Sequence, residues 1–172
     1  MLRLRPYKAC DARDIVTWIK DERSFHQWSA NRFDGCYPLT EDKLNEFYGK
    51  EAYNDSFWEM TAMDDAGVPV GHFIMRFTDN RKKVIRLGFV VVDDSKRGRG
   101  YGKEMIRLAV RYSLDILRAD KVTLGVFTNN PIAFECYRSV GFVPLYTNDK
   151  AFRIGNEYWP CTEMEFAGRN KG

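Results

Sequence analysis

The sequence is poor in metal-binding residues and has no long apolar run. Its 172 residues include only two histidines and four cysteines, and Cys10, Cys36, Cys136 and Cys161 form no Cys-x-x-Cys pair. We therefore expect no metal site. No stretch approaches the ~20 apolar residues of a membrane span, and residues 1–6 lack the apolar run of a secretion signal. We expect a cytoplasmic protein with reduced cysteines and no membrane contact.

Composition also excludes several classes of protein. Hydrophobic residues make up 44% and charged residues 30% of the chain, which is typical of a folded globular protein rather than a disordered one. The net charge of +3 is too small to indicate a nucleic-acid partner. Repeats, low-complexity tracts and linkers are absent, so we predict a single domain over residues 1–172. A homodimer is left open.

The first half of the chain predicts two helices and four strands. Leu2 and Leu4 alternate with arginines as in a short strand. One helix is expected to start near Asp11, followed by a loop that includes Trp28, Phe33, Gly35 and Pro38, and Thr40 is expected to cap a second helix. Hairpin-like spacing then predicts antiparallel strands over residues 57–63, 68–77 and 84–92.

The second half alternates between helix and strand. Helices are predicted over residues 101–118 and 131–140, and strands over 121–127, 142–146 and 158–166. Gly141 is expected at the C-cap of the second of these helices. The predicted fold class is therefore α/β: a mixed, mainly antiparallel sheet of six or seven strands with helices on both faces. The strands 84–92 and 121–127 should be parallel neighbours.

The stretch from Asp93 to Lys103 carries the clearest chemical signal. It follows a predicted strand and opens a helix, so several backbone N–H groups should point outward at the positive end of the helix dipole. Its glycines let the backbone approach a phosphate closely and adopt positive φ. Four basic side chains surround it: Lys96, Arg97, Arg99 and Lys103. The ligand that this pattern favours is a pyrophosphate.

Two better-known phosphate loops do not fit this stretch. The nucleoside-triphosphate loop needs Gly-x-x-x-x-Gly-Lys-Ser/Thr, but Gly102-Lys103 is followed by Glu104. The dinucleotide motif needs Gly-x-Gly-x-x-Gly, and the Gly98-x-Gly100-x-Gly102 of this chain is one residue too tight. A flexible basic surface turn is the plain alternative, although it would not require a strand before it and an amphipathic helix after it.

Two motifs together closely resemble the Gcn5-related N-acetyltransferase (GNAT) superfamily. The first is Arg-x-x-Gly-x-Gly, formed by Arg97, Gly100 and Gly102. The second is Asn-x-x-Ala-x-x-x-Tyr-x-x-x-Gly-Phe, which runs from Asn130 to Phe142. The resemblance is strongest over residues 84–142 and extends weakly, in the order of strands, over the rest of the chain.

This resemblance implies an enzyme that transfers the acetyl group of acetyl-CoA to a primary amine by direct attack in a ternary complex. It assigns the pyrophosphate to Arg97, Gly98, Arg99, Gly100, Tyr101, Gly102 and Lys103. It assigns the pantetheine arm to Val90, Val91, Val92 and Asn130, and one backbone N–H of that strand would polarise the acetyl carbonyl. Tyr137 would protonate the departing thiolate as general acid. The alternative for Tyr137 is an ordinary core position on a short helix.

The general bases that relatives use are missing. A glutamate in the strand 121–127 of some relatives corresponds to Gly125, and a glutamate in the preceding strand of others corresponds to Arg86. A histidine used by a third group would lie near Gly88. Glu59 and His72 remain as proton acceptors, although a purely structural role is the favoured interpretation of each.

The acceptor is less constrained than the cofactor. The regions that hold it in similar proteins are rich in aromatic residues, and these could surround a cation or belong to the core: Phe25, His26, Trp28, Phe33, Tyr37, Tyr158 and Trp159. A small amine and a protein N-terminus both remain open as acceptors. A catalytically weak acetyl-CoA-binding sensor or scaffold module is the alternative function.

Overall fold

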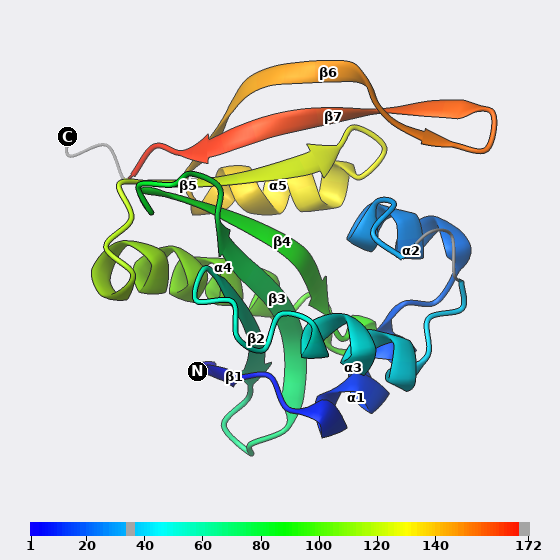
Figure 1. Ribbon diagram of the computed structural model, residues 1–172, viewed down its shortest axis with the longest axis vertical. Coiled ribbons are helices and arrows are strands. Elements are labelled where there is room, and N and C mark those ends of the chain that lie inside the picture. The colour runs from blue at the N-terminus through cyan, green and yellow to red at the C-terminus, as the bar shows by residue number, and fades with distance from the viewer. Residues whose placement is uncertain (34–36, 169–172) are drawn as a thin grey trace.

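The computed structural model describes residues 1–33 and 37–168. One mixed sheet of seven strands, in the order β1-β2-β3-β4-β5-β7-β6, carries helices on both faces (Figure 1). This arrangement confirms the predicted fold class. Gly35 and Cys36 lie outside the described residues. Within the described ranges no helix is long and apolar enough to cross a membrane.

Most elements lie where the sequence predicts them. The strands are β1 (Arg3–Pro6), β2 (Phe57–Met63), β3 (Pro69–Phe77), β4 (Val84–Val92), β5 (Lys121–Phe127), β6 (Phe142–Ile154) and β7 (Glu157–Phe166). The helices are α1 (Ala12–Trp18), α2 (Glu22–Ser29), α3 (Glu41–Gly49), α4 (Tyr101–Arg111) and α5 (Pro131–Val140). A π-helical turn, Tyr112–Ile116, extends α4.

Local capping explains several of these boundaries. The Thr40 side chain accepts a hydrogen bond from the Lys43 N–H at the start of α3. Pro131 begins α5, where its missing N–H costs nothing. Gly141 ends α5 with φ of 120°, a backbone angle that side chains disfavour.

Two boundaries differ from the predictions. Trp28 was expected in a loop but lies in α2, a helix capped by the Asp21 side chain. That helix has only eight residues, and Phe25 and Trp28 are its only large buried apolar residues, so few positions reveal a helical period in the sequence. The strand predicted to end at residue 146 continues as β6 to Ile154, because pairing with β7 supports it despite its exposed side chains.

The sheet pairing opens a gap between two central strands. Strands β1 to β4 pair antiparallel in sequence order, as predicted. β4 and β5 are parallel neighbours, as predicted, but pair only from Val84–Lys121 to Arg86–Thr123. Beyond those pairs β5 continues along β7 instead. The second half of β4 therefore has no strand partner on its β5 side.

Two buried clusters cover the two faces of the sheet. Helices α4 and α5 pack on one face, where Phe73, Leu87 and Met105 belong to the larger cluster. Helices α1, α2 and α3 lie on the opposite side, where Phe25 and Ile74 belong to the second cluster (Figure 1). The sheet, which contains the gap between β4 and β5, therefore has a separately packed layer of helices on each of its faces.

Candidate active site

A β-bulge distorts β4 beside the gap. The register with β3 moves from His72–Val91 to Ile74–Gly88, which inserts one extra residue into β4. Phe89 takes up the bulge with φ of 48°, a rare angle for a bulky residue. Such bulges change the direction of backbone groups. This segment can therefore present an N–H or a carbonyl that would be hydrogen-bonded to the neighbouring strand in a regular sheet.

Helix α2 holds the bulge in place and spans the gap. The Trp28 indole Nε1–H donates to the Phe89 carbonyl oxygen at 2.9 Å. The Gln27 side-chain amide donates to the Asn129 carbonyl at 3.2 Å, at the far side of the gap. The Arg23 guanidinium lies 5.3 Å from the ring centre of Trp159 on β7. One helix therefore links β4 to β7 and to the start of α5.

The loop between β4 and α4 presents unpaired backbone amides. Gly98 and Gly100 have φ of 78° and 80°, and a Cβ built on either would meet no atom within 4 Å. In the part of the chain that the structure describes, the N–H groups from Gly98 to Lys103 have no hydrogen-bond acceptor. The next N–H, that of Glu104, already donates to the Gly100 carbonyl at 3.0 Å. This loop therefore has the geometry that suits an anion at a helix N-terminus.

The basic side chains of this loop divide into two groups. The Lys96 ammonium lies 3.4 Å from an Asp64 carboxylate oxygen, so it braces the loop against the β2–β3 turn. Arg97, Arg99 and Lys103 have no carboxylate within 4 Å among residues 1–33 and 37–168. Three free positive charges thus surround the unpaired amides.

Helix α5, which carries Tyr137, packs against the start of α4. A Cβ built on Gly102 would lie 3.6 Å from the Cys136 sulfur, so the two helices touch at the start of α4. The adjacent Tyr137 is buried, and burial raises the pKa of its hydroxyl. The Asn130 side-chain oxygen accepts from the Ala133 N–H at 3.3 Å, so it caps α5 and keeps its amide N–H groups available.

Comparison with known proteins agrees with this geometry. The sequence profile of the acetyltransferase (GNAT) family matches residues 18–142, which is more than half of the chain. This chain belongs to the GNAT acetyltransferase family. It is an acetyl-CoA-dependent N-acetyltransferase, and the resemblance drawn from its two motifs is confirmed.

The relatives of this GNAT acetyltransferase include polyamine acetyltransferases. It is 22% identical to a spermidine N(1)-acetyltransferase of Vibrio cholerae over 95% of this chain and 91% of that protein. A spermine/spermidine N(1)-acetyltransferase of Bacillus subtilis is 27% identical over 37% of this chain and 42% of that protein. The crystal structure of the Vibrio cholerae spermidine N-acetyltransferase with CoA and spermine has a TM-score of 0.81. At 22% identity it covers 95% of this chain and 94% of that one. That likeness shows a shared fold.

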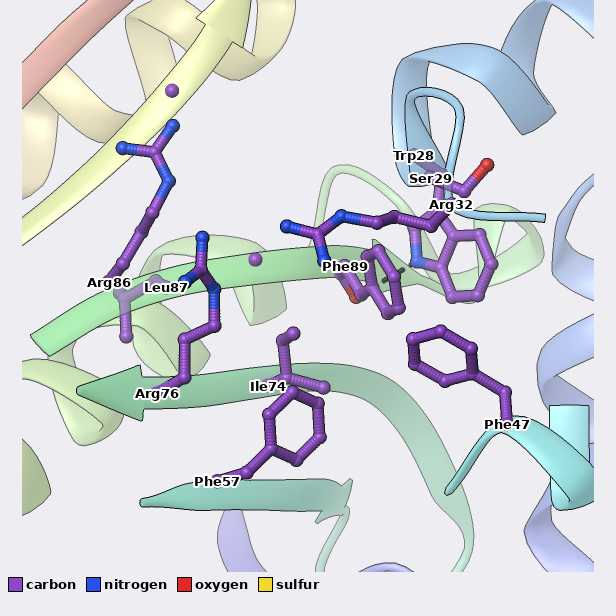
Figure 2. A pocket seen from close by; sticks show the side chains of 12 residues that line it. Trp28, Ser29, Arg32, Phe47, Phe57, Ile74, Arg76, Arg86, Leu87 and Phe89 are labelled. Carbon is purple, nitrogen blue, oxygen red and sulfur yellow. Dashed lines mark hydrogen bonds between the residues drawn. The ribbon is translucent and has the colours of Figure 1, made fainter. Parts of the chain in front are cut away.

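A pocket opens on the sheet face opposite α4 and α5. We call it the arginine pocket, because three arginines line it (Figure 2). They are Arg32, Arg76 and Arg86, and its aromatic lining consists of Trp28, Phe47, Phe57 and Phe89. Because Gly88 and Phe89 also line it, the pocket reaches the bulge of β4.

Some relatives carry a glutamate base at the positions of Arg86 and Gly125. In this GNAT acetyltransferase both positions contribute to an ion pair between β4 and β7. Arg86 reaches past Gly125 to Glu163 on β7, with nitrogen–oxygen distances of 2.5 and 2.9 Å. A Cβ on Gly125 would lie only 2.5 Å from the Arg86 guanidinium. The glycine thus leaves room for this ion pair, and a larger residue there would displace the Arg86 guanidinium from its present position.

The two remaining base candidates lie in different environments. His72 has no exposed surface, and its Nε2 is 2.6 Å from the Tyr48 hydroxyl, so substrate cannot reach it. Glu59 is half-buried and sits opposite Ile74, a residue of the arginine pocket, on the same sheet face. Burial raises the pKa of Glu59, which makes its carboxylate a better proton acceptor. Glu59 therefore remains a candidate for the general base.

The sequence left open whether seven residues, most of them aromatic, surround a cation or belong to the core, and most of them belong to the core or pack against it. Of the seven residues named, only Trp28 lines the arginine pocket. Phe25, Phe33 and Trp159 are buried in the core, and Tyr158 is exposed beside Lys150. The Tyr37 hydroxyl donates to the Lys20 carbonyl, and His26 packs on Phe25 and Trp159. The arginines and the rings of Phe47, Phe57 and Phe89 were missed.

Acetyl-CoA affinity is expected to fall several-fold as sodium chloride rises from about 0.05 M to about 0.5 M. Contacts from Arg97, Arg99 and Lys103 to a pyrophosphate would be charge-assisted, and salt screens exposed charges. Titration calorimetry at both concentrations checks this. An affinity that does not change with salt would show that these side chains do not contact the cofactor.

Acid is expected to destabilise the protein through His72. Burial lowers the pKa of His72 to about 3, whereas the unfolded chain protonates it near the usual value of about 6.5. Below about pH 6.5 the unfolded chain binds a proton on His72 that the folded protein does not bind. The free energy of unfolding is therefore highest above about pH 6.5 and falls as the pH drops below it. Between about pH 7 and about pH 5 the loss should be about 2 kcal/mol.

Urea unfolding of wild type and His72→Gln at these two pH values checks this effect. The variant is less stable at neutral pH because it disturbs the contact with Tyr48, but its pH dependence should be smaller. Equal pH dependence in the two proteins would show that His72 is not the group responsible.

Proposed function

We propose that acetyl-CoA lies in the gap between β4 and β5, with its pyrophosphate on the amides of residues 98–103. Its acetyl group would reach the bulge of β4, and the acceptor amine would enter through the arginine pocket on the other face. The single observation that carries this proposal is the row of unpaired amides at the end of a strand that has lost its partner. Val90, Val91 and Val92 would supply backbone groups to the pantetheine arm, and Asn130 its free amide N–H groups.

The reaction proposed for this site is a direct transfer. The neutral amine nitrogen attacks the thioester carbonyl, and a β4 backbone N–H stabilises the developing oxyanion. As the tetrahedral intermediate collapses, the carbon–sulfur bond breaks and Tyr137 gives its proton to the thiolate. The proton lost by the amine passes to Glu59, directly or through water. These two transfers leave an N-acetyl product and CoA as a free thiol.

The alternative is a module that binds acetyl-CoA without turnover, and it predicts different kinetics. Initial rates should be measured while acetyl-CoA and an amine are varied together, by following loss of the thioester absorbance. A thiol reagent is less suitable, since Cys10 is an exposed free cysteine. Direct transfer in a ternary complex gives intersecting double-reciprocal lines. Parallel lines would indicate an acetyl-enzyme intermediate, and absence of amine-dependent loss would support the binding module.

A further inference from the structure

We infer that the arginine pocket binds an anionic group of the acceptor, so that the substrate class is a small primary amine that also carries a carboxylate or a phosphate. This inference rests on the proposed function and deepens it. It concerns the pocket on the α1–α3 side of the sheet, which is separate from the loop that would hold the pyrophosphate of acetyl-CoA.

The first observation is the register of β3 and β4. Arg76 and Arg86 are direct cross-strand partners and therefore face the same side of the sheet. Like charges directly opposite one another destabilise a sheet unless a counter-charge is present. Glu163 supplies that counter-charge to Arg86 through two hydrogen bonds. Arg76 has no carboxylate within 4 Å among the described residues, although it is half-buried.

The second observation is the convergence of charge within the pocket. Figure 2 shows the guanidinium groups of Arg32 and Arg76 directed toward the middle of the pocket, whereas that of Arg86 points to β5. Burial and the nearby positive charges of Arg32 and Arg86 lower the pKa of Arg76. Among residues 1–33 and 37–168, no Asp or Glu belongs to the lining. An unpaired, partly desolvated guanidinium is costly, and a planar carboxylate or a phosphate is its best partner.

The third observation is the size of the pocket along β4. Arg86 precedes Phe89 by three residues, which is at most ~10 Å along a strand. An acceptor of about amino-acid size can therefore place its anion on the arginines and its amine beside the bulge. The same charges repel a polycation, so the arginine pocket is unsuited to the polyamines on which the named relatives act.

The test compares amines that share a spacer and differ only in the second group. A set of ω-amino carboxylates, ω-aminoalkyl phosphates, the matching carboxamides and the matching diamines is assayed with wild type, with spermidine as a further arm. We expect kcat/KM to be about 10- to 100-fold higher for one or both anionic sets than for the carboxamides, the usual range for a charged hydrogen bond. Which anionic set is preferred distinguishes carboxylate from phosphate.

Arg76→Gln then tests the residue itself. It should lower kcat/KM about 10- to 100-fold for the preferred anionic amine, mainly through KM, and leave carboxamides and acetyl-CoA affinity nearly unchanged. Arg111→Gln, an exposed arginine of α4, is the matched control and should alter neither. If Arg76→Gln does not fold, Arg76→Lys keeps the charge and should keep the preference for anions.

The outcomes separate this inference from the proposed function. If wild type prefers carboxamides, diamines or spermidine, the transferase stands and the anion site is wrong. The site is equally wrong if Arg76→Gln affects all amines alike or weakens acetyl-CoA binding. If no amine of any charge is acetylated, the proposed function fails and this inference falls with it.

Discussion

Gly100→Val is expected to weaken acetyl-CoA binding by about 100-fold or more. Gly100 caps α4 with φ of 80°, and no atom lies within 4 Å of a Cβ built there. That open space is where the proposed site places a phosphate, so a valine side chain would occupy it and turn the backbone away from φ > 0. Losing two or more charge-assisted hydrogen bonds, each about 1.5–3 kcal/mol, accounts for this magnitude. Titration calorimetry with acetyl-CoA measures it.

Gly67→Val separates loss of the site from backbone strain. Gly67 lies in the β2–β3 turn with φ of 77° and likewise has no atom within 4 Å of a built Cβ. Both variants should therefore lose a similar amount of stability, about 1–2 kcal/mol from the left-handed conformation. Only Gly100→Val should lose affinity. Unchanged binding in Gly100→Val would remove the loop from the cofactor site.

Tyr137→Phe is expected to lower kcat by about 10²–10⁴ and to leave acetyl-CoA affinity nearly intact, the usual range for a lost general acid. The substitution keeps the ring that packs on Phe142 and removes only the hydroxyl. The ordinary pKa of a phenol, about 10, already keeps Tyr137 protonated at neutral pH, as an acid must be, and burial raises this pKa further. Steady-state rates with a saturating amine measure the effect.

Tyr112→Phe is the matched control for this substitution. Tyr112 packs against the same core cluster from the π-helical turn after α4, and nothing places it in the site. It should turn over at the wild-type rate. If Tyr137→Phe also does so, the thiolate takes its proton from another group or from solvent. If Tyr137→Phe alone unfolds, the hydroxyl has a structural role.

The phosphate loop could be predicted from sequence because its information is local. Three glycines, the strand before them and the helix after them lie within a short segment, and the φ values of Gly98 and Gly100 agree with the reason for choosing glycine. The same holds for α5, whose cap, first proline and terminal glycine are all visible in its sequence. Such features need no knowledge of tertiary packing.

The arginine pocket could not be predicted because its residues meet only through register and packing. Arg76 and Arg86 face each other because of the pairing of β3 with β4, which includes a bulge that no local pattern indicates. Arg32 joins them from the turn that follows α2, a helix too short for its apolar pattern to be evident in the sequence. A partial signal exists in the sequence, since Arg76 lies near the end of β3 and Arg86 near the start of β4, on either side of one hairpin turn.

The most direct test of the account is amine-dependent turnover by wild-type protein. Acetyl-CoA is incubated with the protein and with each amine in turn, and mass spectrometry measures N-acetyl product and free CoA together. The account predicts equal amounts of the two, many turnovers per protein molecule, and no CoA release above the background rate without an amine. Tight acetyl-CoA binding with no acetylated product from any amine would contradict it.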